Sequence, residues 1–330
     1  MAQKMLDVIG IGNAIVDVIA RADDAFLAAE DIAKGAMTLI DDARAQSLYA
    51  AMGPAIESSG GSAANTIAGL AALGATTGYI GLVGNDTLGE IFRHDITALG
   101  TQFQTAAATD GVATARCLIL VTPDAQRSMN TFLGACVGLG PEHVDDAQIA
   151  AAKVVYLEGY LWDPPRAKEA FLKAATIAQQ TGGKVALSLS DTFCVSRHRD
   201  SFLDLVRNQV DILFANEDEL KELFETDDFD QAVSEIRQIT GVSAITRGSQ
   251  GAVILDAEGV FNTPAGKVAD VIDTTGAGDL FAAGFLHGYC SGADAATCGQ
   301  FGNIVAAEVI SHFGARPEAD LKALVQGVTP

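Results

Sequence analysis

Short apolar runs alternate with longer amphipathic segments through the second half of the chain. Apolar runs of strand length occupy residues 154–160, 185–189, 210–215 and 243–246, and helical patterns occupy residues 164–181, 200–208, 217–224 and 231–240. Repeated strand–helix units of this length are typical of a parallel sheet covered by helices on both faces. We therefore predict a doubly wound, mostly parallel α/β fold, to which the apolar run at residues 7–11 adds a buried strand.

A second pattern indicates a smaller sheet. Residues 114–121 and 127–132 alternate in the manner of strands on either side of a turn at Pro123-Asp124, which predicts a β-hairpin. Together with strand-like segments near residues 14–20 and 35–40, this hairpin would form a small sheet of its own. Helical patterns at residues 23–34, 41–52, 90–99, 279–289 and 293–312 complete the expected elements.

Composition narrows the class of protein. The chain has 330 residues, 49% of them hydrophobic, and its 21 basic and 42 acidic residues give a net charge of −21. Such acidity argues against binding to nucleic-acid phosphates or to an anionic membrane surface. Five cysteines without a CxxC pair and five histidines without ligand spacing favour reduced thiols and no zinc site. With no signal-peptide pattern and no apolar stretch of spanning length, we expect a cytoplasmic protein.

The string Asp273-Thr-Thr-Gly-Ala-Gly-Asp279 carries the clearest chemical signal. It runs directly into an apolar helical pattern. The first N–H groups of a helix lack partners within it and favour an anion, which Gly276 and Gly278 leave room to approach. Asp279 then lies beside that anion site, an arrangement suited to transferring an anionic group to a hydroxyl. The alternative is that the glycines only make a turn and Asp279 only supports the helix dipole.

Two further segments have competing interpretations. Gly10-Ile-Gly12 lacks the third glycine of a dinucleotide fingerprint, so we reject a Rossmann site. Asp17 is an acid within an apolar run, which by itself fits a surface residue of an edge strand. The small-residue entrance to a helix at residues 57–74 serves either helix–sheet packing or the approach of a ligand to the backbone.

These strings resemble the signatures of the ribokinase/PfkB family of carbohydrate and nucleoside kinases. The Asp273–Asp279 string resembles the second family signature. Residues 57–74 and the Gly84-Asn-Asp-Thr-Leu-Gly89 string resemble the first, and the resemblance extends from Asp7 to about Ala315. It implies a single ribokinase-like α/β domain over residues 1–330, with a lid of segments about 13–20, 35–40 and 112–132. It also implies ATP-dependent phosphoryl transfer to a hydroxyl, with a lid that excludes water.

The resemblance assigns a role to each matching position. Asp279 would be the base, the N–H groups of Gly276, Ala277 and Gly278 would hold the phosphoryl group, and Arg127 would reach the transferring phosphate. The expected substrate-binding residues are Asn13, Asp17, Gly60, Gly61 and Asn65, and the carboxylate of Asp17 would accept hydrogen bonds from a diol of the substrate. The expected donor-nucleotide residues are Asn216, Thr246, Gly248, Gly251 and Asn303. Glu219 would order Mg²⁺ through water, and Asp273 and Thr275 match positions that bind K⁺.

Several of these positions also have purely structural interpretations. Asn216 and the acids behind it can cap a helix, Asn303 can be a polar residue on a half-buried helix, and Arg127 can be a solvated turn residue.

The expected acceptor is adenosine, because the string from Arg127 to Ala135 looks more like adenosine kinases than ribokinases. A purine needs an apolar slot, for which the candidates are Met37, Leu39, Leu133, Ala135, Leu161 and Trp162. The alternative for each of them is an ordinary core residue. Ribose, fructose, 2-keto-3-deoxygluconate, inosine and guanosine remain open as acceptors, as does a catalytically idle regulator that binds nucleotides or sugars. The expected partners are small molecules only, and the chain would be a monomer or a homodimer.

Overall fold

The computed structural model describes residues 5–124 and 126–327. Its main sheet has nine strands in the order β14-β13-β12-β11-β10-β9-β1-β5-β6. All neighbouring strands are parallel except at β12-β13 and β13-β14. This confirms the predicted doubly wound, mostly parallel α/β fold. In chain order the strands are β1 (Leu6–Ile11), β5 (Thr77–Ile80), β6 (Gln102–Phe103), β9 (Ala152–Glu158), β10 (Lys184–Ser188), β11 (Ile212–Asn216), β12 (Val242–Thr246), β13 (Ala252–Leu255) and β14 (Val260–Thr263).

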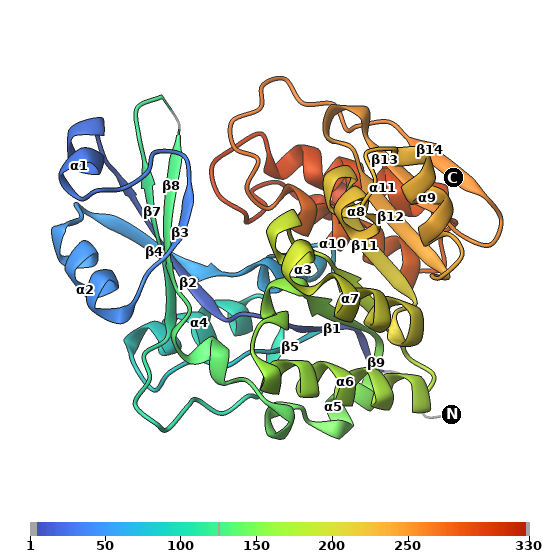
Figure 1. Cartoon of the computed structure of the whole chain (residues 1–330), viewed down its shortest axis with the longest axis horizontal. Coiled ribbons are helices and arrows are strands. Elements are labelled where there is room, and N and C mark those ends of the chain that lie inside the picture. The colour runs from blue at the N-terminus through green and yellow to red at the C-terminus, as the bar shows by residue number, and fades with distance from the viewer. Residues whose placement is uncertain (1–4, 125, 328–330) are drawn as a thin grey trace.

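A second, five-stranded sheet has the order β3-β8-β7-β2-β4 and stands apart from the main body (Figure 1). We call it the lid sheet. Four of its strands, β2, β3, β7 and β8, lie in segments that the sequence pattern predicts as strands. The fifth, β4, was not predicted as a strand, and it pairs antiparallel with β2 along residues 55–60. The lid strands are β2 (Ile15–Arg21), β3 (Met37–Leu39), β4 (Ala55–Gly60), β7 (Ala115–Val121) and β8 (Arg127–Phe132).

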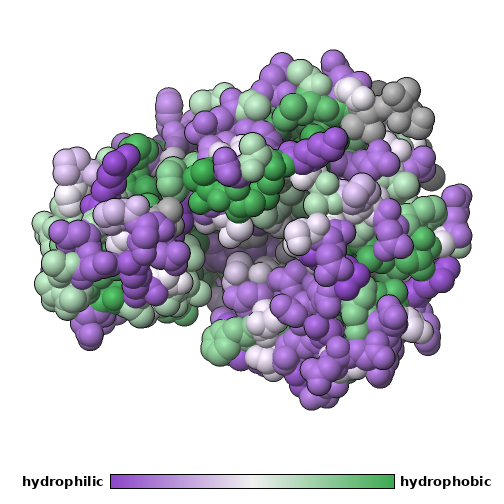
Figure 2. All heavy atoms as spheres, turned by 90° about the horizontal axis from the view of Figure 1, so that it is seen from above, coloured by the Kyte–Doolittle hydropathy of each residue, from purple (hydrophilic) through white to green (hydrophobic). Residues whose placement is uncertain are grey.

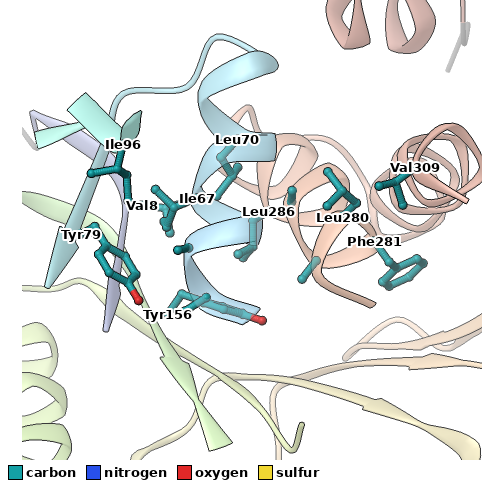
Figure 3. Close-up of a cluster of buried hydrophobic side chains, with 14 of the residues drawn as sticks. Val8, Ile67, Leu70, Tyr79, Ile96, Tyr156, Leu280, Phe281, Leu286 and Val309 are labelled. Atoms are coloured by element: carbon teal, nitrogen blue, oxygen red, sulfur yellow. The ribbon is translucent and has the colours of Figure 1, made fainter. Parts of the chain in front are cut away.

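Helices cover both faces of the main sheet, and the alternation of strand side chains divides the core between them. Val8 and Tyr156 belong to one buried cluster with α3, α10 and α11 (Figure 3), whereas Ile9 and Leu157 belong to another with α5–α9. The helices are α1 (Asp24–Ala29), α2 (Asp42–Ala51), α3 (Ser62–Ala72), α4 (Thr87–Ala98), α5 (Asp146–Ala151), α6 (Pro165–Gln180), α7 (Thr192–Gln209), α8 (Glu217–Phe224), α9 (Phe229–Ile236), α10 (Ala277–Cys290), α11 (Ala295–Val309) and α12 (Leu321–Gln326).

The first cluster also continues into the lid sheet. Val16 and Val18 of β2 and Leu118 of β7 are fully buried, together with Leu48 of α2. On the opposite face of β2, the side chains of Ile15, Asp17 and Ile19 are only partly buried. Seen from above, the molecule is hollowed between the lid at the left and the main body (Figure 2).

Candidate active site

Asp279 lies in the first turn of α10, whose N-cap is Gly276. Gly276 has a φ of 78°, in the left-handed region that favours glycine, and a side chain there would overlap Ala315. A side chain at Gly278 would meet no protein atom within 4 Å. Ala277 N–H donates to the Thr274 carbonyl at 3.2 Å. Of the three predicted phosphoryl-binding N–H groups, this one is therefore already used.

Two side chains of α3 hold the Asp279 carboxylate. Ser62 Oγ donates to Oδ1 at 2.6 Å, and Asn65 Nδ2 donates to Oδ2 at 3.0 Å. Asn65 was expected to face a sugar, but here its amide points to Asp279. Burial raises the pKa of Asp279, while the hydrogen bonds from Ser62 and Asn65 and the charge of Arg316 oppose that rise. The result is an oriented carboxylate that is more basic than a free one.

Asp17 of β2 faces the same space from the lid sheet. A side chain at Gly60 would overlap its carboxylate, and Gly61, with a φ of 94°, brings the chain against the Asn13 carbonyl. Within the described residues the Asp17 carboxylate accepts no hydrogen bond, so both oxygens remain available to a ligand. Burial raises its pKa to about 6, against the charges of Arg316 and Arg127.

A buried carboxylate that we did not predict holds Asn13 and the first turn of α3 by hydrogen bonds. Glu158, at the end of β9, accepts hydrogen bonds from Asn13 Nδ2 at 2.6 Å, Asn13 N at 3.3 Å and Ala63 N at 2.8 Å. Burial raises its pKa to about 7. Asn13 was predicted to bind substrate, and its side-chain amide instead donates to Glu158. The sequence contained a signal for this residue, because Glu158 is the last residue of an apolar strand, and ligands bind at the carboxyl ends of the strands of a parallel sheet.

Arg127, at the start of β8, joins the lid sheet to the loop before α10. Its Nη1 lies 2.9 Å from Asp273 Oδ2 and 3.2 Å from Thr275 Oγ1. Its side chain is 9% exposed, and Nε and Nη2 are buried with no hydrogen-bond partner. Buried, unpaired donors of a guanidinium are suited to an anion such as a phosphate. Arg127 is thus not a solvated turn residue.

The same contacts bear on the predicted potassium site. Asp273 Oδ1 accepts from Thr275 N at 3.0 Å and Thr275 Oγ1 at 2.7 Å, and Oδ2 accepts from Gly314 N at 2.9 Å besides pairing with Arg127. Asp273 and Thr275 do lie together, but the carboxylate is already neutralised by an arginine. A cation at Asp273 does not fit this arrangement unless Arg127 moves, and we derive no step from potassium.

Four of the five predicted donor-nucleotide residues lie at or just after the carboxyl ends of β11 and β12. Asn216 and Thr246 are partners in the register of these strands, and Gly248 and Gly251 form the next turn, both with positive φ. Asn303 of α11 is 7% exposed and donates to Thr263 Oγ1 at 2.9 Å and to the Thr263 carbonyl at 3.2 Å. Its amide nitrogen therefore ties α11 to β14.

Glu219 performs the structural role that the sequence left open. It forms a capping box with Asn216: Asn216 N and Nδ2 donate to its carboxylate at 3.0 and 2.7 Å, and Glu219 N donates to Asn216 Oδ1 at 2.8 Å. Each carboxylate oxygen keeps acceptor capacity for a water, which fits an indirect magnesium contact. Over residues 5–124 and 126–327, no three His, Cys, Asp or Glu side chains are placed to hold a metal ion directly.

The candidates for an apolar slot divide into two groups. Met37 and Leu39 lie on the Asp17 face of the lid sheet, in register with Met129 and Thr131, and are 49% and 54% exposed. Trp162 and Leu161 are core residues, at 3% and 1% exposure, and Ala135 is 3% exposed. The Trp162 ring stacks on Phe202 and its Nε1 donates to Ser201. Trp162 is therefore corrected from slot to core, as is Ala135, whereas Leu133 is partly exposed.

Three comparisons place this geometry among known proteins. A family model described as pfkB family carbohydrate kinase matches residues 52–321. The adenosine kinase of Sinorhizobium meliloti is 52% identical, with a TM-score of 0.90 over 97% of this chain and 98% of that one. A probable sugar kinase from Rhizobium etli is 50% identical, with a TM-score of 0.91 over 98% of both chains. The ATP-dependent ribose-1-phosphate kinase of Halopiger xanaduensis is 31% identical over 81% of this chain and 86% of its own. Within the described residues, no helix has the length and apolar character needed to cross a membrane.

Proposed function

Because the chain belongs to the pfkB family of carbohydrate kinases, we propose that it transfers the γ-phosphoryl group of ATP to the 5′-hydroxyl of adenosine, giving AMP and ADP. The coarser activity follows from the family: the protein is a sugar or nucleoside kinase, a phosphotransferase that uses ATP and an alcohol acceptor. The observation that carries the proposal is the placement of Asp279 at the start of α10, across from Asp17 on the lid sheet.

In the proposed reaction, Asp279 holds the attacking hydroxyl and takes its proton. The oxygen forms a bond to the γ-phosphorus as the bond to the ADP oxygen breaks, and the N–H groups of Gly276 and Gly278 face the transferring group. The raised pKa of Asp279 suits this role. A loose transition state needs the proton removed late, so positioning and electrostatics supply most of the rate.

Charge on the donor side is offset by Arg127, whose two unpaired nitrogens, Nε and Nη2, are free to donate to phosphate oxygens. A magnesium ion would be held by the donor phosphates and by waters ordered near Glu219 and Asn216, and it would neutralise the charge that develops on the leaving group. Asn216, Thr246, Gly248 and Gly251 would line the donor-nucleotide site. We infer a cytoplasmic enzyme from the same activity.

The lid sheet supports a nucleoside rather than a free sugar as the acceptor. The two free oxygens of Asp17 would accept hydrogen bonds from the 2′- and 3′-hydroxyls. On the same face, the exposed side chains of Met37 and Leu39 offer an apolar surface to a flat base. The similarity to the S. meliloti adenosine kinase over almost the whole chain points to the same acceptor.

The test is an acceptor panel with purified protein, ATP and Mg²⁺. We would compare kcat/KM for adenosine, inosine, guanosine, ribose, fructose, 2-keto-3-deoxygluconate and ribose 1-phosphate by ADP release. Adenosine should exceed every free sugar and ribose 1-phosphate by at least about tenfold, since a site built for a base gains little from a sugar alone. A sugar that matches adenosine would overturn the nucleoside assignment and leave the kinase assignment standing.

A further inference from the structure

Four consecutive residues after α11 contact three different parts of the site. The Phe313 ring lies 5.9 Å from the Arg127 guanidinium, Gly314 N donates to Asp273, and Ala315 packs on Gly276. Arg316 then reaches the turn before α3. The 313–316 segment therefore touches the lid sheet, the loop before α10 and the glycine turn at Gly60-Gly61.

Arg316 makes the most extensive of these contacts. Its Nε and Nη2 donate to the Ser59 carbonyl at 3.1 and 2.7 Å, Nη2 also donates to Ser59 Oγ at 3.0 Å, and Nη1 donates to the Ala64 carbonyl at 2.8 Å. Ser59 and Ala64 flank the Gly60-Gly61 turn on its two sides, so one planar group fixes both ends of that turn. Asp95 of α4 holds Ser59 from the other direction, by accepting its N–H at 2.9 Å.

Two carboxylates that form no ion pair with the guanidinium also act on it through their charge. Burial lowers the pKa of Arg316, while the negative charges of Asp17 and Asp279 are the largest influences that raise it again. Reciprocally, Arg316 lowers the pKa of each of those two carboxyls. The titratable groups facing Arg316 are Asp17 of β2, Asp279 of α10, Tyr79 of β5 and Asp95 of α4, and those facing Asp279 include Tyr156 and Glu158 of β9 and Tyr160 after it.

We propose that Arg316 is a positioning residue for phosphoryl transfer. By clamping the turn from Ser59 to Ala64, it sets the spacing between the acceptor-binding carboxylate, Asp17, and the base, Asp279. Its positive charge also balances the negative charges of these two carboxylates. This inference rests on the proposed role of Asp279. It assigns two separable functions to one side chain: a geometric one that needs the planar fork, and an electrostatic one that needs only a positive charge.

Those two functions predict different results for two substitutions. Arg316→Gln loses the charge, so the pKa of both carboxyls rises and their ionised forms are lost at higher pH. We expect the acidic limb of the kcat/KM profile to move up by at least about half a pH unit, and kcat to fall at least about tenfold. Arg316→Lys keeps the charge but cannot donate to Ser59 and Ala64 together. Its acidic limb should stay within about 0.2 pH unit of the parent, while kcat falls at least about threefold.

The matched control is Arg93→Gln. Arg93 of α4 also donates to two main-chain carbonyls, those of Phe103 at 3.1 Å and Thr105 at 2.7 Å, but it is not among the charges that act on Asp17 or Asp279. Its loss should lower thermal stability and leave the pH profile in place. Melting temperatures of all three variants, with ADP release from ATP, Mg²⁺ and adenosine over pH 5.5–9, complete the experiment.

The outcomes separate this inference from the function it rests on. If Arg316→Gln shows the pH profile and kcat of Arg93→Gln, Arg316 is only structural and the inference is overturned. If Arg316→Gln does not fold, Arg316→Lys decides, because a Lys variant with the parental kcat or a displaced acidic limb also overturns it. Asp279→Asn, assayed in parallel, tests the base itself. If this variant keeps the parental activity, the proposed mechanism is wrong. If it is inactive but the pH profile of Arg316→Gln does not move, only the proposed role of Arg316 is wrong.

Discussion

Asn65 of α3 donates a hydrogen bond of 3.0 Å to Asp279 of α10, across 214 residues of sequence. The bond joins the two glycine-rich turns that the sequence marks as entrances to helices. It leaves Asp279 held on both oxygens, by Asn65 and by Ser62. A base that is fixed in this way can be removed with little change in the surrounding structure, which makes it a clear test.

Replacing Asp279 by Asn should lower kcat at least about a hundredfold, the low end for loss of a general base, with the fold intact. Because burial raises the pKa of Asp279, its ionised form is lost on acidification at a higher pH than for an ordinary carboxyl. The corresponding acidic decline of kcat should disappear in the variant. Asp230→Asn, which removes an acid from the first turn of α9, is the control for a helix-dipole effect and should keep the parental rate. Activity of Asp279→Asn within about threefold of the parent would remove Asp279 from the mechanism.

Asp17→Ala should reduce kcat/KM for adenosine more than for 2′-deoxyadenosine or 3′-deoxyadenosine, because each deoxy compound has already lost one of the hydroxyls that the carboxylate would bind. With the pKa of Asp17 raised to about 6, protonation below that pH should also raise KM for adenosine in the parent but not in the variant. Competition kinetics with the three nucleosides at pH 5.5 and 7.5 measure both effects. Equal losses on all three would show that Asp17 does not bind the diol.

Arg127→Ala should lower kcat more than it raises KM for the acceptor, since its unpaired N–H groups are assigned to the phosphates. The change also leaves Asp273 buried without its partner, at a cost of about 3–5 kcal/mol in the free energy of unfolding. The kinetic constants should therefore be measured at a temperature at which circular dichroism shows that the variant is folded. Arg116→Ala is the control, because Arg116 lies in the same lid sheet, is 13% exposed and pairs with Asp42 instead. An effect confined to KM for the acceptor would place Arg127 on the acceptor rather than the donor.

Potassium dependence can be tested through the same arginine. Arg127 already neutralises Asp273 in the arrangement described, so exchanging K⁺ for tetramethylammonium at equal ionic strength should change the parental rate less than about twofold. In Arg127→Gln the carboxylate loses that partner, and the rate in K⁺ should exceed the rate in tetramethylammonium by a larger factor. A strong potassium requirement in the parent would mean that Arg127 leaves Asp273 during turnover.

Local signals in the sequence were sufficient for much of this architecture. The bounds of α8 were predicted residue for residue, because the capping box of Asn216 and Glu219 marks its start. The turn before α10 was predicted because glycines and an acid stand directly before an apolar helix.

Contacts between distant segments explain what was missed. The residues of β4, Ala-Ile-Glu-Ser-Ser-Gly, have little strand character and become a strand by pairing with β2. Arg316 reaches Ser59 across 257 residues. Apolar residues such as Trp162 and Met37 look alike in sequence, and only the packing shows that the first is core and the second is exposed on the lid sheet.

That difference between Met37 and Trp162 leads to a test of the apolar slot. Met37→Ala removes a side chain that is 49% exposed, so stability should change by less than about 0.5 kcal/mol. If the side chain contacts the base, KM for adenosine should rise at least about fivefold, since a lost apolar contact of this size is worth about 1 kcal/mol or more. KM for ATP should stay within about twofold, because Met37 lies on the acceptor side.

Trp162→Ala should show the reverse. Its ring packs with Phe171 and Phe202 in the core, so its loss should lower the free energy of unfolding by about 3–5 kcal/mol. Trp162→Phe keeps most of the apolar volume and provides a folded variant for kinetics, in which KM for adenosine should match the parent. Chemical denaturation and steady-state kinetics on the three variants give both quantities. An unchanged KM for adenosine in Met37→Ala would remove Met37 from the slot, and a raised one in a fully stable Trp162→Phe would return Trp162 to it.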